Sequence, residues 1–339
     1  MKYAFLLALL LGGISASAAT TAACATCHAA QARTHGATGM ANALEDVRTC
    51  DILKSHPKLV FQEGSYHYEI TRDGNASQYQ VSDGKQTLRV PIGWAFGLGS
   101  AGQTYVFQIN GRYFESRVSY YKALNGLDLT VGAQSTVPSN LEEAAGHALD
   151  KEAARACFNC HATHASVDRK LDLSAMVPGV QCERCHGSAQ AHLAGFRNGQ
   201  PHVGAMRQLS KMSTDETSEF CGQCHRTWSQ VATNGPHGIN NIRFQPYRLT
   251  NSKCYDVDDA RIRCTACHDP HREVVAEPAS YDAKCQACHA AVKAGAKKCP
   301  VSASNCAGCH MPRLELLGSH NLFTDHQIRI VKKNEPYPN

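Results

Sequence analysis

The stretch Cys157-Phe158-Asn159-Cys160-His161 is one of seven copies of the pentapeptide Cys-x-x-Cys-His in this chain of 339 residues. The copies account for 14 of the 17 cysteines. Numbered as motifs 1 to 7 in chain order, they contain Cys24, Cys27 and His28; Cys157, Cys160 and His161; Cys182, Cys185 and His186; Cys221, Cys224 and His225; Cys264, Cys267 and His268; Cys285, Cys288 and His289; and Cys306, Cys309 and His310.

This pentapeptide is the attachment signature of c-type haem. Two cysteines three residues apart lie on one face of a helical turn, where both can form thioethers to one porphyrin. The histidine that follows them is then the proximal ligand of the iron. Zinc sites also use Cys-x-x-Cys pairs, but they do not require a histidine after every second cysteine. A disulfide across so short a loop is strained. We therefore predict seven covalently attached haem c groups.

The second axial ligand of each iron decides whether a haem is a closed redox site or is open to a substrate. Of the 18 histidines, 11 lie outside the motifs, so supply exceeds the demand of seven irons and counting cannot show an open site. The predicted distal ligands in the haem-rich half are His192, His237, His271, His320 and His326, and Met40 is an alternative soft ligand near motif 1. We rank lower His35, His147, His164 and His202, and lowest His56 and His67. The cysteines without an assigned role are Cys50, Cys254 and Cys299.

The order of segments predicts an exported protein. Residues 1–19 combine a basic start, a short apolar run and small residues, which is typical of a signal peptide. The apolar run is too short for a membrane span, and no later segment is long and apolar enough for one. We expect a first haem segment over 20–56, an antiparallel β module over 57–136 and a six-haem helical and loop domain over 137–339. The formal charge of +5 is offset by the haem propionates, which gives nucleic-acid binding no support.

We predict a mainly α fold with loops, organised around seven haems, with a small antiparallel β module near the N-terminus. Alternating patterns predict strands at 66–70, 79–81, 105–109 and 113–120. The turn signals between them are Asp73-Gly74-Asn75, Asp83-Gly84 and Asn110-Gly111. A capping box at Ser139 predicts a helix that runs into Cys157, and another at Ser213 predicts the helix that carries motif 4.

The strings around the motifs resemble the cytochrome c-552/4-like multihaem family. They are Cys185-His186-Gly187, Phe244-Gln245-Pro246-Tyr247-Arg248-Leu249, Ser252-Lys253-Cys254, Cys267-His268-Asp269-Pro270-His271, Cys309-His310-Met311-Pro312, His320, and Phe323-Thr324-Asp325-His326-Gln327-Ile328-Arg329. Relatives by haem packing are pentahaem nitrite reductase, hydroxylamine oxidoreductase and octahaem tetrathionate reductase. The resemblance implies haems with two histidine ligands, and it supports the five distal histidines named above.

The resemblance also has departures from the enzymes. Pentahaem nitrite reductase replaces one motif histidine with lysine, whereas all seven motifs here keep histidine. No residue here matches the tyrosine that cross-links the catalytic haem of hydroxylamine oxidoreductase. The leading prediction is therefore a periplasmic or extracellular electron carrier without a catalytic residue, with a quinol dehydrogenase or another cytochrome as redox partner.

Two other functions remain open at this point. One is a reductase of a nitrogen or sulfur oxyanion at a five-coordinate haem, for which the polar residues near the motifs are Arg184, His202, Arg226 and Arg248. The other is a homo-oligomer, a conductive filament in which a distal histidine comes from a second subunit. The reductase requires one iron with an open axial face, whereas in the carrier every iron has two ligands.

Overall fold

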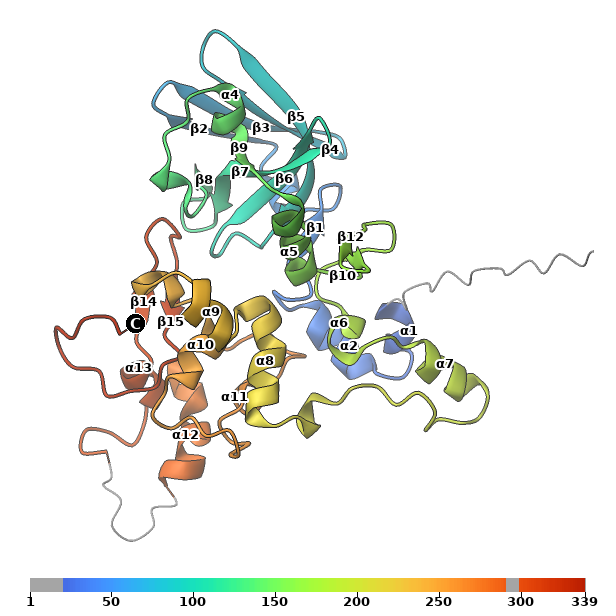
Figure 1. The fold of residues 1–339 in the computed structure, drawn as a ribbon, viewed down its shortest axis with the longest axis vertical. Helices are drawn as coiled ribbons and strands as arrows, with labels where there is room; N and C mark the ends of the chain where they lie inside the picture. Colours follow the sequence, from blue (N-terminus) through green and yellow to red (C-terminus); the bar gives the residue numbers. More distant parts are fainter. Residues whose placement is uncertain (1–20, 291–298, 339) are drawn as a thin grey trace, which may run out of the picture.

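An antiparallel β-sheet forms one end of the molecule, and the short helices that carry the motifs form the other (Figure 1). The computed structural model describes residues 21–290 and 299–338. The predicted signal peptide, residues 1–19, lies outside the described residues. In the described part of the chain, no helix has the length and apolar character needed to cross a membrane.

The large sheet has nine strands within the described residues, and seven of them, β2 to β8, pair in sequence order. The two outside this path are β1, which pairs with β5, and β9, which pairs with β7. Their bounds are β1 Leu44–Asp46, β2 Lys58–Glu63, β3 Tyr66–Asp73, β4 Ala76–Ser82, β5 Thr87–Phe96, β6 Gln103–Ile109, β7 Arg112–Tyr121, β8 Gly126–Leu129 and β9 Gly146–Ala148.

The predicted turn signals connect these strands. Asn110 and Gly111 have φ of +50° and +76° and form the two-residue turn between β6 and β7, where Ile109 faces Arg112. Positive φ at both positions suits the twist of the strands, and asparagine followed by glycine adopts it at low cost. Gly74-Asn75 joins β3 to β4, and the Asp83 side chain accepts backbone N–H groups in the β4–β5 turn. The predicted strands and turns are confirmed.

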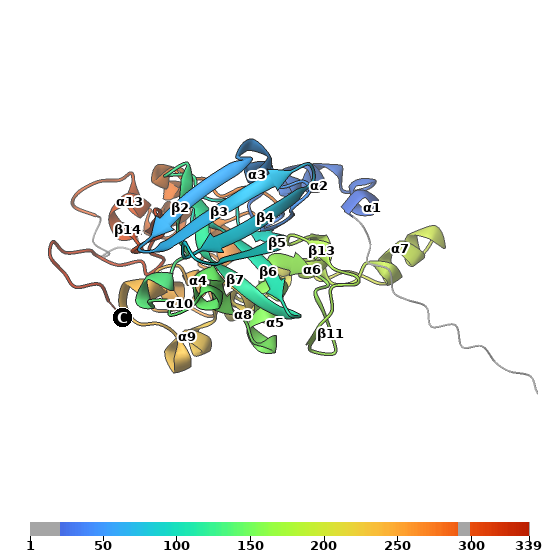
Figure 2. The same ribbon diagram turned by 90° about the horizontal axis from the view of Figure 1, so that it is seen from above.

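Aromatic side chains fill the interior of the sheet. Tyr68, Tyr79, Phe107 and Phe114 form a row with ring centroids 5.2 to 6.4 Å apart, and each is 2% exposed or less. The sheet curves so that the end of β2 comes close to β7, where Glu63 of β2 and Arg117 of β7 form a two-pronged ion pair of 2.6 and 2.7 Å. Viewed from above, β2 to β5 lie over the helical part (Figure 2).

The remaining elements are short. The helices are α1 Thr21–Ala25, α2 Ala29–Gly36, α3 Asp51–Ser55, α4 Leu141–Ala145, α5 Lys151–His161, α6 Cys182–His186, α7 Gln190–Arg197, α8 Thr214–His225, α9 Trp228–Asn234, α10 Gln245–Thr250, α11 Cys264–Cys267, α12 Asp282–His289 and α13 Cys306–His310. The 3-10 turns are η1 Ala133–Ser135, η2 Leu209–Lys211, η3 Gly238–Asn241 and η4 Pro278–Tyr281. Three two-stranded sheets pair β10 Ala162–Thr163 with β13 Val177–Pro178, β11 Ser166–Val167 with β12 Lys170–Leu171, and β14 Arg313–Glu315 with β15 Leu322–Thr324.

The predicted fold class is wrong in its balance of helix and strand. The protein is not mainly α with a small β module, because a large antiparallel sheet reaches from Leu44 to Ala148 and further strand pairs lie among the motifs. The alternation of apolar and polar residues did not predict β5, because Pro91 and Gly93 interrupt the pattern. A bulge also shifts the register of this strand after Ile92. The alternation also did not predict β1 and β9, which are only three residues long.

The two predicted capping boxes have different outcomes. Ser213 caps α8 with reciprocal bonds to Glu216, as predicted, and α8 carries motif 4. The cap predicted at Ser139 is wrong by one residue, because Asn140 caps α4 by accepting the N–H of Glu143. The predicted continuous helix is two helices, because α4 ends at Ala145 and the chain then pairs with β7 as β9. Asp150 caps a new helix, α5, which carries motif 2.

Motif 2 docks directly on the sheet. Phe158, the residue after Cys157, is fully buried in a second hydrophobic cluster with Phe96 of β5 and Val106 of β6. Its ring meets those of Trp94, Phe96 and Tyr113 edge-on at 5.1, 5.2 and 5.9 Å. The sheet is therefore packed against the first of the six motifs that lie between residues 157 and 310.

Candidate haem-attachment sites

Each motif places its two cysteines on a single turn of helix. Motif 3 is α6 and motif 7 is α13, while motifs 2, 4 and 6 form the last turns of α5, α8 and α12. In motifs 1 and 5 the histidine N–H donates to the carbonyl of the first cysteine at 2.9 Å, which is the same helical turn. All 17 cysteines lie in the described residues and none forms a disulfide, so none of the seven pairs is closed by one. This is the geometry that attachment of one porphyrin to both thiols requires.

Three motif histidines are oriented by remote backbone carbonyls. The Nδ1 atom of His161 lies 2.9 Å from the carbonyl of Ala43. His186 makes the same contact with Arg207 at 2.8 Å, and His310 makes it with Arg329 at 2.8 Å. A metal-binding histidine usually donates its second ring N–H in this way, which fixes the tautomer and leaves Nε2 for the metal. These residues therefore fit an iron bound at Nε2.

Burial disfavours the charged form of three motif imidazoles, one of which is His161. Desolvation lowers the pKa of His161, of His225 and of His268, because a charged ring is disfavoured away from water. Neutral imidazole is the form that binds a metal.

Two distal candidates lie beside motif histidines. The ring centroid of His326 is 6.2 Å from that of His268, and the centroid of His271 is 5.9 Å from that of His186. Two imidazoles on opposite faces of one metal have centroids about 6 Å apart, since each metal–nitrogen bond is about 2 Å long and the ring centre lies about 1 Å beyond the nitrogen. His326 and His271 also have Nδ1 near an oxygen, of Thr324 at 3.0 Å and of Asp269 at 3.2 Å. Burial lowers the pKa of His326 to about 4.

Among the described residues, the other predicted distal ligands show no ring contact with a motif histidine. His192 packs edge-on against Phe196, and its buried Nδ1 has no hydrogen-bond partner. His237 is exposed just before η3, and Met40 is half-buried. The Nε2 atom of His320 lies 2.8 Å from the Asp128 carboxylate of β8. The distal roles of these four residues stay predictions.

Two of the lower-ranked histidines, His35 and His164, lie close to the motifs. His35 is buried, with its ring 6.4 Å from that of His271 and its Nε2 2.8 Å from the carbonyl of Val180. Its position on α2, seven residues after His28, is the signal that places it near the motifs. His164 has a left-handed backbone and its Nε2 lies 2.8 Å from the buried carboxylate of Glu183.

Neighbouring motifs contact one another through their cysteines. In four pairs the two thiols lie close enough for one to shift the pKa of the other, and the pairs are Cys24 with Cys182, Cys160 with Cys224, Cys221 with Cys264, and Cys285 with Cys306. These contacts join motif 1 to 3, motif 2 to 4, motif 4 to 5, and motif 6 to 7. The helices agree, since α8 contacts α5 and α11, and α12 contacts α13.

Two further contacts complete the series. The guanidinium of Arg184, in motif 3, donates to the carbonyl of Asn159 in motif 2 at 3.2 Å and lies 3.8 Å from the Cys224 sulfur of motif 4. The Tyr281 hydroxyl, which precedes motif 6, lies 3.5 Å from Nδ1 of His268 in motif 5. The seven motifs thus form one contiguous series, 1, 3, 4, 5, 6 and 7, with motif 2 beside 3 and 4. In Figure 1, α1, α6, α8, α12 and α13 lie on the side away from the sheet, while α5, which carries motif 2, lies between them and the sheet.

Comparisons with known proteins give two matches. Residues 119–187 match the family described as cytochrome c554 and c-prime. The multiheme cytochrome MtrA of Shewanella baltica (strain OS185) is 24% identical over 200 residues, which is 54% of this chain and 50% of that protein, so the chain spans about half the length of the curated relative it matches. No solved structure matches the chain. Together with the motifs and their histidine geometry, these similarities support a multihaem c-type cytochrome.

Proposed function

We propose that this protein is an exported electron-transfer cytochrome with seven covalently attached haem c groups, one at each motif. The contiguous series of motif contacts carries the proposal. Tunnelling between redox centres falls steeply with distance, so a transfer chain needs attachment sites that are direct neighbours. Motifs 1 and 7, at the ends of the series, are the natural points of electron entry and exit.

Bound haem supplies an iron that changes between the ferric and ferrous states. The chain itself supplies position. Remote carbonyls orient three of the motif histidines, burial lowers the pKa of His161, and Arg184 ties motifs 2, 3 and 4 together. No group in this arrangement has to move during transfer.

The finer parts of the proposal rest on the sequence. The character of residues 1–19 supports export to the periplasm or beyond, and the strings around the motifs support a place in the cytochrome c-552/4-like family. The similarity to MtrA supports a redox protein as partner, either a quinol dehydrogenase or another cytochrome.

The proposal is tested on holoprotein made with a c-type maturation system. Intact mass should show seven haems, and replacing both cysteines of motif 7 with alanine should remove one. The matched control, Cys50, Cys254 and Cys299 each changed to serine, should keep all seven because these thiols belong to no motif.

Electron paramagnetic resonance of the oxidised protein then separates carrier from enzyme. We expect low-spin signals only, and full reduction followed by reoxidation by a second cytochrome. A high-spin signal that shifts with nitrite or hydroxylamine would identify an open iron and replace the carrier with a reductase.

A further inference from the structure

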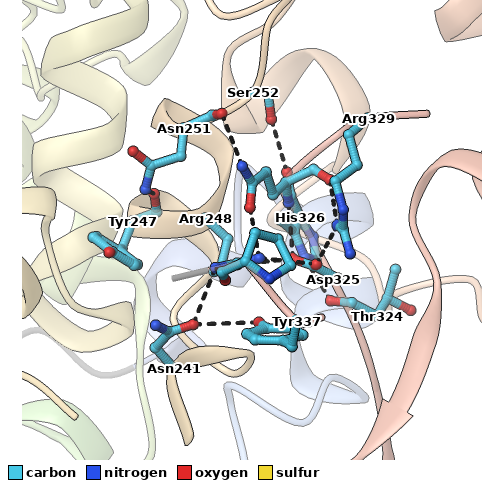
Figure 3. Close-up of polar contacts among 12 residues, drawn as sticks. Asn241, Tyr247, Arg248, Asn251, Ser252, Thr324, Asp325, His326, Arg329 and Tyr337 are labelled. Carbon is cyan, nitrogen blue, oxygen red and sulfur yellow. Dashed lines mark hydrogen bonds and ion pairs between the residues drawn. The ribbon is translucent and has the colours of Figure 1, made fainter. Parts of the chain in front are cut away.

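The segment after motif 7 is tied to α10 by a buried ion pair. Arg248 of α10 and Asp325 are both 0% exposed, although 77 residues separate them. The guanidinium donates from Nε to one carboxylate oxygen at 2.9 Å and from Nη2 to the other at 3.0 Å (Figure 3). Such a two-pronged contact fixes direction as well as distance.

The remaining donors of Arg248 are also satisfied. Nη1 reaches Asn241 at 3.2 Å and the carbonyl of Pro338 at 2.7 Å, and Nη2 also reaches Gln327 at 2.7 Å. The guanidinium lies 4.5 Å from the ring centroid of Tyr337. The group therefore has one orientation, in which residues on both sides of position 326 are bound to it.

The backbone around His326 is held by the same part of the chain. Ser252, just after α10, donates to the carbonyl of His326 at 3.1 Å and accepts the N–H of Ile328 at 2.8 Å. Asp325 accepts the N–H of Gln327 at 3.0 Å. The His326 ring then lies 6.2 Å from the ring of His268, with its Nδ1 turned to the carbonyl of Thr324.

A buried ion pair is weak as a source of stability, because removing two charges from water costs about as much as their attraction returns. What it does supply is geometry. We propose that Arg248 and Asp325 are positioning residues, which hold His326 opposite His268 as the second ligand of the iron attached at motif 5. This rests on the proposed function, and it assigns to one distal histidine both its haem and its support.

The first test is whether His326 is a ligand at all. His326→Ala should convert one of the seven haems from low spin to high spin in the oxidised holoprotein, with the mass unchanged. Added imidazole should restore the low-spin signal. A spectrum identical to wild type would overturn the assignment, while seven haems and full reduction would leave the proposed function standing. Fewer haems in the wild-type protein would contradict the proposed function instead.

The second test is whether the ion pair acts through His326. Arg248→Lys keeps the positive charge but loses the two-pronged contact. Asp325→Asn removes the negative charge with almost no change in shape. If one of the two variants does not fold, the other still provides the test. Each of these two variants should show the same high-spin signal as His326→Ala, but at lower intensity. Added imidazole should convert this signal back to low spin.

The matched control is Arg117→Lys, because Arg117 makes the same kind of two-pronged contact with Glu63 and is 4% exposed, but lies in the sheet. It should lower the melting temperature without any high-spin signal. If Arg248→Lys and Asp325→Asn behave like this control, with lower stability and a wild-type spectrum, the pair is only structural and the proposal is wrong.

Discussion

Replacing Phe158 with alanine tests whether motif 2 and the sheet are one packed unit. The side chain is 0% exposed and three aromatic rings meet it at 5.1 to 5.9 Å, so its removal leaves a cavity that rigid neighbours cannot fill. Deleting a buried phenylalanine ring costs about 3–5 kcal/mol. Each edge-on ring pair contributes about 0.5–1.5 kcal/mol beyond burial, which places the expected loss in the upper half of that range.

The assay is guanidinium unfolding of the holoprotein at pH 7, followed by far-ultraviolet circular dichroism, after intact mass has shown that haem attachment is unchanged. Attachment should survive because the pentapeptide leaves this position free. Phe196→Ala is the control, since that ring is 52% exposed and should cost less than about 1 kcal/mol. Equal losses in the two variants would refute the packing argument, and so would a loss at Phe158 below about 1 kcal/mol.

Three further predictions concern single contacts. Hydrogen bonds from Arg117 lower the pKa of Glu63 below its ordinary value of 4.5, so its contribution is present at neutral pH and is lost as the pH falls from 4.5 through the lowered folded pKa. The stability gap between wild type and Glu63→Gln should therefore close in acid, and a gap that is constant from pH 7 to pH 3 would contradict this. Ser213→Ala removes the capping box of α8 and should cost about 1 kcal/mol in the same unfolding assay, whereas no change would mean that α8 does not depend on its cap. Gly179→Ala would put Cβ against the carbonyl of Ala41 at a φ of +76°, so we expect a loss above about 1 kcal/mol, and normal stability would show that this turn can rearrange.

The sequence predicted what is local. The motifs, the Asn110-Gly111 turn and the Ser213 cap each depend on residues within a few positions, and the structure has them as expected. The sheet was underestimated because Pro91 hides a long strand whose partners, not its own pattern, determine it.

What could not be predicted is long-range. The carbonyl of Ala43 that orients His161 is 118 residues away, and the partner of Arg248 is 77 residues away. The resemblance drew attention to the strings that contain Arg248 and Asp325, but nothing in either string says that they meet. Likewise, counting cannot assign the eleven histidines outside the motifs to seven predicted irons. Only the fold brings His326 and His271 beside motif histidines.

The position of His326 has a consequence for the order in which the proposed haem sites would be completed. All seven attachment pentapeptides lie before residue 311, so under the proposed function every covalent bond could form on a chain truncated after residue 310. The imidazole that faces His268, and the carboxylate of Asp325 beside it, follow the last pentapeptide in the sequence. We therefore expect such a truncated chain to carry all of the proposed haems, while the iron at motif 5 would lack its second ligand. The number of attached haems therefore reports covalent attachment, whereas the spin state reports whether each iron has its second ligand.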